Sequence, residues 1–286
     1  GGLAVFGCAD GYVYALRASD GALAWRFQAA PVDQRLMCFE QLESVWPVHG
    51  SVLIHDDVLY CVAGRSMFLD DGLRLWRLDP ATGEVLSKTV LDEHETDTGK
   101  HIQDFVSWLN MPTALPDILS CDGRYVYMRS QPFRLDGTRL PLEAMPASGD
   151  ADAGAPLPTQ HEEYAHLFCP TGFLDDSNWH RSYWMYGSTF VSGWCGYFLA
   201  GRVAPAGRIL SFDEDAVYGF GRLPEYFRWV TPLEYHLFAA DKITEMPTET
   251  VAPGRPLTSV RVEKTESLHC AGTALSVEAW LKPKRS

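Results

Sequence analysis

Apolar and polar residues alternate with a period of two over short segments of this chain. Between residues 12 and 17, Tyr12 and Tyr14 share one side of an extended segment, while Val13 and Ala15 share the other. A period of two is the signature of a β-strand, because successive side chains of a strand point to opposite faces. The pattern therefore predicts a strand over 12–17.

The same alternation continues in segment 23–27, and a tight turn separates the two segments. Asp20 and Gly21 lie in this turn, and an Asp-Gly pair readily adopts the positive φ angles of a short hairpin. Glycine and proline interrupt the rest of the chain so often that long helices are not expected. These features predict an antiparallel meander and an all-β fold.

One unit, an acidic turn followed by an apolar strand that ends in tyrosine, occurs four times. The copies lie at 10–14, 56–60, 122–127 and 213–218. The first two tyrosines are separated by about the length of a four-stranded propeller blade, roughly 40–45 residues, and the later gaps fit blades with insertions. The segment 137–160, rich in Pro, Ala, Gly and Asp, is expected to be one such exposed loop.

Two strings carry a family resemblance. D-G-x-V-Y-A-L-x-A-x-D-G-x-x-x-W-x-F at 10–27 and L-W-R-L-D-P-A-T-G-E at 75–84 resemble the repeat of the PQQ-like β-propellers, the quinoprotein-dehydrogenase-like and BamB-like repeat proteins. In this repeat Gly permits the turn, Asp caps it, and Trp and Tyr fill the space between blades. The resemblance implies a partial propeller of about four to five blades over residues 1–245, with the remaining blades in the full-length protein.

The C-terminal region is expected to be different. Residues 246–286 begin with a proline-rich stretch, which predicts a linker, and the strand-like segment 274–283 is similar to the opening strand of LamG-like, concanavalin A-like domains. We therefore expect a linker followed by an incomplete jelly-roll strand. The two resemblances together indicate a piece of a larger bacterial protein that works in the periplasm or outside the cell, with its signal peptide beyond this sequence.

Composition excludes several kinds of partner. The chain has 24 basic and 37 acidic residues, a formal net charge of −13, so an anionic nucleic-acid backbone would be repelled. No apolar run approaches the roughly 18 residues that span a bilayer, so membrane insertion is not expected. The seven cysteines show no C-x-x-C spacing and are expected to be mostly buried as small apolar side chains.

Two functions from different classes fit the resemblance. The first is a non-catalytic binding or scaffolding propeller, which needs no cofactor and presents loops or the central opening to a carbohydrate, a protein or a small ligand. The alternative is a dehydrogenase that uses PQQ and Ca²⁺, with its site partly outside this sequence. Such enzymes use an Asp base, Glu, Asn or Asp metal ligands and often adjacent cysteines. This chain has no adjacent cysteines, and no position matches the base or the ligands, which favours the binding module.

An aromatic segment near the middle of the chain is the first candidate ligand site. Aromatic rings with interleaved polar tips suit a stacking surface for a sugar or a quinone. Its members are Trp179, His180, Arg181, Tyr183 and Trp184. Asp175 and Asp176, just before them, are candidate Ca²⁺ ligands. Packing of these rings between blades is the competing interpretation.

A second candidate site combines two segments of the N-terminal half. Glu43, Trp46 and His49 precede a predicted strand, and Arg65 and Asp70 lie in a glycine-flanked loop. Loops between strands commonly carry recognition groups. The competing interpretation is an Arg65–Asp70 ion pair that only holds the loop.

Other chemistry finds little support in the sequence. His161 and His166 are five residues apart, whereas a zinc-protease helix needs two histidines four apart on one face. We expect a polar loop that leads into a strand starting at His166. The acidic run 92–97 lacks an EF-hand pattern and is expected to be a solvated loop.

Overall fold

The computed structural model describes the N-terminal half almost completely and the C-terminal half in separate segments. The described residues are 2–38, 40–50, 52–101, 114, 116, 118–141, 162–169, 184–188, 204–222, 235–242 and 259–260. Within these ranges the regular structure consists of β-strands and one short 3₁₀ turn, η2 (Glu162–Tyr164). The all-β prediction is confirmed. No helix in the described segments is long and apolar enough to cross a membrane.

The strands form antiparallel sheets in chain order, as expected for a meander. The first sheet contains β1 (Leu3–Gly7), β2 (Tyr12–Arg17) and β3 (Leu23–Gln28). A two-stranded hairpin follows, with β4 (Arg35–Cys38) and β5 (Gln41–Ser44). The second sheet contains β6 (Leu53–His55), β7 (Val58–Ala63), β8 (Leu73–Leu78) and β9 (Val85–Leu91).

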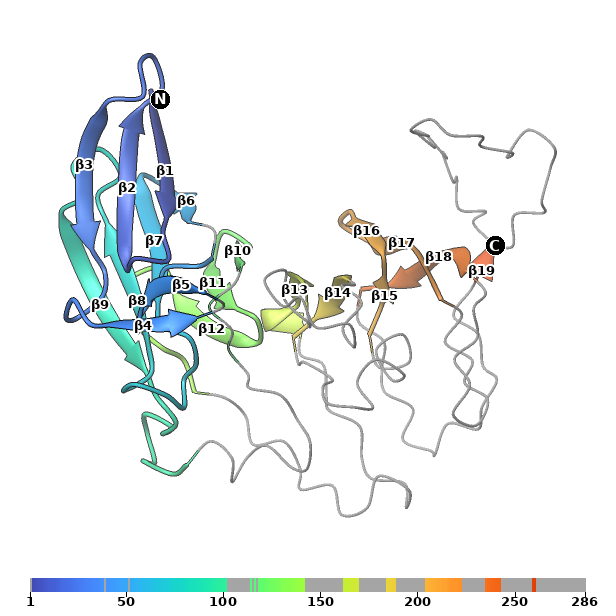
Figure 1. Ribbon diagram of the computed structural model, residues 1–286. Helices are drawn as coiled ribbons and strands as arrows, with labels where there is room; N and C mark the ends of the chain where they lie inside the picture. Colours follow the sequence, from blue (N-terminus) through green and yellow to red (C-terminus); the bar gives the residue numbers. More distant parts are fainter. Residues whose placement is uncertain are drawn as a thin grey trace.

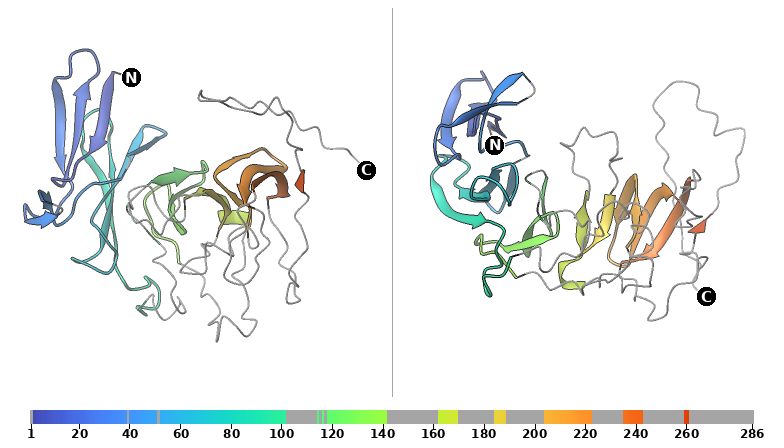
Figure 2. Two further views of the ribbon diagram at one scale, coloured as in Figure 1. Left: turned by 45° about the vertical axis from the view of Figure 1, so that its right-hand side comes forward. Right: turned by 60° about the horizontal axis from the view of Figure 1, so that its bottom comes forward.

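Three further sheets continue the series. The third contains β10 (Leu119–Cys121), β11 (Tyr125–Met128) and β12 (Gln131–Arg134). The fourth contains β13 (His166–Phe168), β14 (Trp184–Gly187) and β15 (Ala206–Gly207). The last contains β16 (Ile209–Phe212), β17 (Ala216–Arg222), β18 (Tyr235–Asp241) and β19 (Ser259–Val260). The sheets follow one another along the molecule (Figure 1; Figure 2), the architecture of a partial β-propeller.

Strand β7 shows why these sheets stack face to face. Leu59 and Cys61 point into the apolar core shared with the first sheet, whereas Tyr60 and Val62 point into the core shared with the third. All four side chains are buried. A strand covered on both faces has no polar side, so its sequence is continuously apolar rather than alternating. Sheet two is therefore a blade between two neighbours.

Tryptophans fill the space between the first two sheets, as the repeat predicts. The indole Nε1 of Trp25 donates to the carbonyl oxygen of Pro80 at 3.2 Å, and that of Trp76 donates to Ala29 at 2.9 Å. Phe27 meets Trp76 edge to face, with ring centroids 5.0 Å apart. Each ring buries apolar area while its polar atom keeps a partner.

The expected aspartate caps are present at the equivalent hairpin turns. Each aspartate side chain accepts hydrogen bonds from backbone N–H groups of its own turn. Asp20 accepts from Ala22 and Asp136 from Thr138. Asp79 accepts from Ala81 and Thr82. Backbone N–H groups hold the pKa of Asp79 and of Asp136 below the usual range. The turn at Asp136 extends to Leu140, which bonds back to β12. The first residues of the expected 137–160 loop therefore close a hairpin, and the rest lies outside the described residues.

The four copies of the acidic-turn unit do not occupy equivalent strands, so the predicted alignment of the repeats is wrong in the first sheet. Both β2 and β8 have a register shift, at Ala15/Leu16 and Arg77/Leu78, and both run into the aspartate-capped turn. Strand β2 therefore corresponds to β8, not to β7, which contains Tyr60. An acidic turn followed by an apolar strand suits either hairpin of a meander, so the short motif alone does not distinguish them.

The acidic run 92–97 is a loop, as expected, and its residues are exposed or partly exposed with the exception of Glu95. Glu95 is 5% exposed, and its Oε2 accepts hydrogen bonds from the backbone N–H groups of Asp97 and Thr98. Gly99 follows at a positive φ of 65° and closes the turn. The carboxylate is used to cap a tight turn rather than to meet water. Of the region 246–286, the structure describes only β19, which pairs with β18.

Candidate functional site

The β4–β5 hairpin carries the candidate site and lies between the first two sheets in chain order. Leu36 pairs across the strands with Glu43, and Met37 pairs with Leu42. Directly opposed residues point to the same face of an antiparallel pair, so the first pair and the second pair occupy opposite faces. Leu36 packs against the core between the first two sheets, which makes its face the inner one.

Arg65 fixes the inner face of the hairpin to the second sheet. Its Nη2 donates to Glu43 Oε2 at 2.6 Å and to the carbonyl oxygen of Ser44 at 3.2 Å, and its Nη1 lies 3.8 Å from Cys38 Sγ. Gly64 holds the start of this loop at a positive φ of 126°. The guanidinium thus uses its planar fork to join two elements that are distant in sequence.

The expected Arg65–Asp70 ion pair is wrong, because Arg65 is paired with Glu43 instead. The side chains are 22% and 13% exposed, so most of the pair is removed from water. A mostly buried carboxylate needs a charged or hydrogen-bonding partner close by, and Arg65 supplies that partner to Glu43.

His49 completes a cluster of three predicted site residues. Its Nε2 lies 3.7 Å from Glu43 Oε2. Burial lowers the pKa of His49, the Glu43 carboxylate raises it, and the Arg65 cation lowers it. The net shift is downward, which keeps the imidazole neutral at pH 7. The Glu43 cluster, meaning Glu43, His49 and Arg65, is therefore one ion pair with a neutral imidazole ring beside it.

Trp46 and Asp70, the other two predicted members, form a separate contact. Trp46 is 7% exposed, and its Nε1 donates to the carbonyl oxygen of Asp70 at 2.7 Å. The guanidinium of Arg74 lies 5.3 Å from the indole ring. Asp70 contributes its backbone from a turn at φ 54°. Trp46 therefore packs inside the fold, and its ring face is occupied by Arg74.

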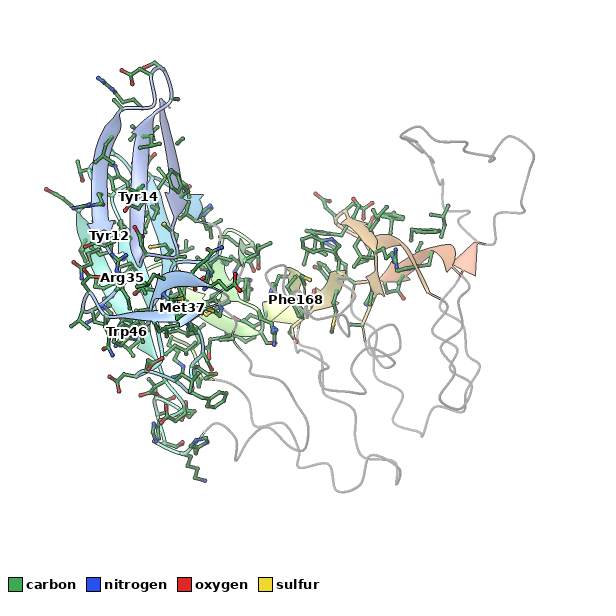
Figure 3. All side chains as sticks on the ribbon, in the orientation of Figure 1. Tyr12, Tyr14, Arg35, Met37, Trp46 and Phe168 are labelled. Carbon is green, nitrogen blue, oxygen red and sulfur yellow. The ribbon has the colours of Figure 1, made fainter. Side chains whose placement is uncertain are left out.

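Two exposed apolar residues on the hairpin were missed by the sequence reasoning. Met37, labelled in Figure 3, is 68% exposed and Leu42 is 61% exposed, and they form a cross-strand pair on the outer face of the hairpin. Leu36, Met37 and Cys38 form a continuous apolar run that gives no alternation to identify an outer face. The segment 38–41, Cys-Phe-Glu-Gln, contains no Gly, Pro, Asn or Asp, so it carries none of the usual signals of a hairpin turn.

Most of the aromatic candidate site lies outside the described residues. Asp175, Asp176, Trp179, His180, Arg181 and Tyr183 belong to that part of the chain. Trp184 is described: it starts β14, is partly buried and pairs with Gly207. The stacking surface and the Ca²⁺ ligands remain predictions.

The described residues do not fit the PQQ–Ca²⁺ group that the alternative function needs. Calcium takes six to eight oxygen ligands, usually several carboxylates. The described residues contain no group of three or more His, Cys, Asp or Glu side chains that could hold a metal ion. Glu43 is already neutralised by Arg65, so no step through PQQ is derived from these residues.

Comparison with known proteins gives distant structural likenesses. No family model matches the sequence, and no curated protein matches it. BamB from Moraxella catarrhalis is 14% identical with a TM-score of 0.34, over 85% of this chain and 56% of that chain. Dihydro-heme d1 dehydrogenase NirN in complex with DHE is 14% identical with a TM-score of 0.35, over 92% of this chain and 44% of that one. The chain thus spans about half the length of these structures.

Proposed function

We propose that this chain is a non-catalytic binding module whose β4–β5 hairpin docks a protein partner. The observation that carries the proposal is the exposed Met37–Leu42 pair on a hairpin whose inner face is fixed by the Glu43–Arg65 ion pair. Binding at such a site requires no cofactor.

Burial of the Met37 and Leu42 side chains against a partner would remove apolar surface from water, which favours binding. Neighbouring exposed apolar side chains on a projecting element are typical of protein interaction sites. Methionine adds a flexible, polarisable side chain that adapts to different apolar grooves. Val32, at the approach to the hairpin, is also half exposed, which extends the apolar surface that a partner would cover.

The fixed inner face makes the hairpin a pre-organised binding element. Arg65 bonds to both strands of the hairpin, at Cys38 and at Glu43. A hairpin held in one orientation loses little conformational entropy when a partner binds, so more of the contact energy appears as affinity. The Glu43 cluster therefore supports recognition by positioning Met37 and Leu42.

A protein partner fits the described residues better than a carbohydrate does. Sugar recognition needs an accessible aromatic ring face. Trp25 and Trp76 are engaged between the first two sheets, and Trp46 is buried beneath Arg74. A carbohydrate would have to use the stacked rings of Phe6 and Tyr14 on the first sheet or the predicted surface at Trp179, so carbohydrate binding is an outcome that the experiment must distinguish.

The cellular setting belongs to the same proposal. The PQQ-like repeat and the LamG-like segment favour a bacterial protein of the periplasm or the cell exterior, with the remaining propeller blades in the full-length chain. The protein partner would then be another extracytoplasmic protein.

A peptide selection tests the proposal. The purified chain is panned against a random twelve-residue peptide library and, in parallel, against a glycan array. We expect enrichment of peptides rich in aliphatic and aromatic residues, and their binding should fall at least roughly tenfold in the variant Met37→Ser/Leu42→Ser. The matched control, Val85→Ser/Leu86→Ser, removes another half-exposed apolar pair on β9.

Three results would contradict this function. The first is the absence of any enriched peptide. The second is a set of peptides that bind equally well to both variants. The third is a rise in the melting temperature with PQQ and Ca²⁺, because a ligand of the native state must stabilise it. Strong glycan binding that survives in the hairpin variant would instead identify a carbohydrate-binding module.

A further inference from the structure

The β4–β5 hairpin is a two-stranded sheet of its own, so its hydrogen-bond pattern shows which backbone groups point to its edges. The N–H of Val45 donates to the carbonyl oxygen of Gln34 at 3.0 Å, so these residues form a hydrogen-bonded pair at the open end of the hairpin. Hydrogen-bonded and non-hydrogen-bonded pairs alternate along an antiparallel ladder. The pairs of the second kind therefore direct their N–H and C=O groups away from the hairpin.

Two pairs of the hairpin have this outward orientation of the backbone groups. They are Arg35–Ser44 and Met37–Leu42. The surroundings of Ser44 agree with this alternation, because its N–H donates to the carbonyl oxygen of Ala9 at 2.8 Å and its carbonyl oxygen accepts from Arg65 Nη2 at 3.2 Å. The fold itself therefore uses part of the β5 edge.

The β4 edge, in contrast, is open. Within the described residues, the backbone N–H and C=O groups of Arg35 and Met37 make no hydrogen bond. Both residues are accessible on β4 (Figure 3), with the Arg35 side chain 40% exposed and Met37 68% exposed. A row of unpaired N–H and C=O groups at a strand edge is a template for another strand.

The stacking of blades does not use the β4 edge. The first two sheets contact each other through their faces, where Val13 and Leu59 share one apolar core. The hairpin belongs to neither of these sheets. A further blade stacked on the first sheet would likewise use the face of that sheet, so the stacking requires none of the backbone groups of Arg35 and Met37.

We propose that the partner of the hairpin is an extended peptide segment that adds to the β4 edge as a third strand. The proposal rests on the docking function of the hairpin and names the class of partner. Every second side chain of the added strand lies on the outer face of the hairpin, beside Met37. Main-chain hydrogen bonds contribute affinity for any extended sequence, and contacts with Met37 and Leu42 select apolar side chains at alternate positions.

Charge restricts the added strand to a neutral or basic segment. The chain carries a formal net charge of −13, which repels an acidic peptide and equally a second copy of this chain. Arg35 is the cation at the edge, and its Nε lies 3.1 Å from Asp33 Oδ1. Because Asp33 already neutralises Arg35, the edge attracts no acidic partner. The expected partner is therefore a neutral or basic strand with apolar residues at every second position.

An N-methyl scan of a selected peptide tests the proposal on the wild-type chain. Each N-methyl group removes one backbone donor and leaves the peptide side chains unchanged. The N–H groups of a strand point alternately to its two sides, so we expect binding to fall at least roughly fivefold at every second position and to stay within about twofold at the positions between. A peptide that binds through Met37 and Leu42 without this alternation would overturn strand addition and leave the docking function in place. If no peptide bound, both would fail.

Two substitutions at Arg35 test the protein side of the contact. Arg35→Pro removes an N–H that the hairpin does not use, at the first residue of β4, where proline is tolerated. Arg35→Ala removes the same side chain and keeps the N–H. We expect Arg35→Pro to bind at least roughly threefold more weakly than Arg35→Ala, and amide exchange at Met37 in the wild type to slow when the peptide binds.

Three results would contradict strand addition at β4. The first is equal binding by Arg35→Pro and Arg35→Ala. The second is unchanged amide exchange at Met37 in the peptide complex, which tests the edge without any substitution. The third is self-association of the wild-type chain that Arg35→Pro abolishes, because it would assign the β4 edge to a second copy of this chain.

Discussion

The ring of Tyr127 lies flat on the ring of His166, with centroids 3.7 Å apart and 9° between their planes. His166 belongs to β13 of the fourth sheet, whereas Tyr127 belongs to β11 of the third. His166 Nε2 lies 2.9 Å from the carbonyl oxygen of Arg129, in the turn between β11 and β12, and Nδ1 lies 2.8 Å from that of Tyr164. One buried imidazole therefore joins two consecutive sheets.

The buried His166 imidazole makes the stability of the fold depend on pH. Burial lowers the pKa of His166 to about 4, although the Tyr164 and Arg129 carbonyls and Asp122 each raise it. In the unfolded chain the pKa returns to about 6.5, so below pH 6.5 the unfolded state binds the proton first. We expect the free energy of unfolding to fall between about pH 6.5 and pH 4, by roughly 3 kcal/mol in total. Urea unfolding across this range measures it.

Two variants isolate the contribution of His166. His166→Gln removes one titrating group and should make the pH dependence between 6.5 and 4 shallower, while the part due to His49, whose pKa burial also lowers, remains. His94→Gln replaces a histidine whose side chain is 51% exposed and should leave the dependence as it is. A wild-type curve that is already flat in this window would contradict the buried neutral imidazole.

The Glu43–Arg65 ion pair should be worth more than an ordinary surface pair. Arg65→Met leaves the Glu43 carboxylate mostly buried without its cation, at an expected cost of about 1–3 kcal/mol in the free energy of unfolding. Arg17 and Asp20 form a matched surface pair, with side chains 57% and 50% exposed, and Arg17→Met should cost no more than about 1 kcal/mol.

A double-mutant cycle separates the ion pair from other effects of the substitution. Combining Arg65→Met with Glu43→Gln should recover about 1 kcal/mol or more relative to the sum of the single variants. Equal costs for Arg65→Met and Arg17→Met, with additive effects in the cycle, would show that the hairpin is not fixed by this pair.

The turn of the second sheet should tolerate no side chain at Gly83. Its φ is 76°, and a Cβ there would lie 2.7 Å from the Trp25 ring. Gly21 has a similar φ of 72° with nothing within 4 Å of an added Cβ. Gly21→Ala should therefore cost about 1 kcal/mol from the backbone alone, and Gly83→Ala at least about 1 kcal/mol more, because Trp25 must move.

Thermal and chemical unfolding of the two alanine variants measures this difference. Equal destabilisation by Gly21→Ala and Gly83→Ala would mean that the first two sheets do not pack with Trp25 against the turn. A larger loss for Gly83→Ala would locate the contact between the sheets at that turn.

Much of the fold could be predicted from local chemistry. The period-two segments, the Asp-Gly turns and the tryptophans each act within a hairpin or between adjacent sheets, and β2, β3 and the Asp79 cap formed as expected. The repeat was misaligned because an acidic turn before an apolar strand suits either hairpin of a sheet. The register shifts of β2 and β8 in the structure distinguish the two hairpins.

The candidate site was predicted only in part, because its geometry depends on one long-range contact. Glu43, His49 and Arg65 were identified as polar groups in loops, and the structure brings them together. Nothing local indicated that Arg65 would pair with Glu43 rather than Asp70, since that choice follows from how the hairpin folds over the second sheet. The exposure of Met37 could not be predicted either, because it also depends on how the hairpin folds over the second sheet.

The most direct test of the central claim is a titration of a selected peptide into the wild-type chain and the two serine double variants. The account predicts saturable binding to the wild type, at least roughly tenfold weaker binding to Met37→Ser/Leu42→Ser, and unchanged binding to Val85→Ser/Leu86→Ser. Equal affinity for all three proteins would show that the hairpin is not the recognition surface, and it would contradict the proposed function.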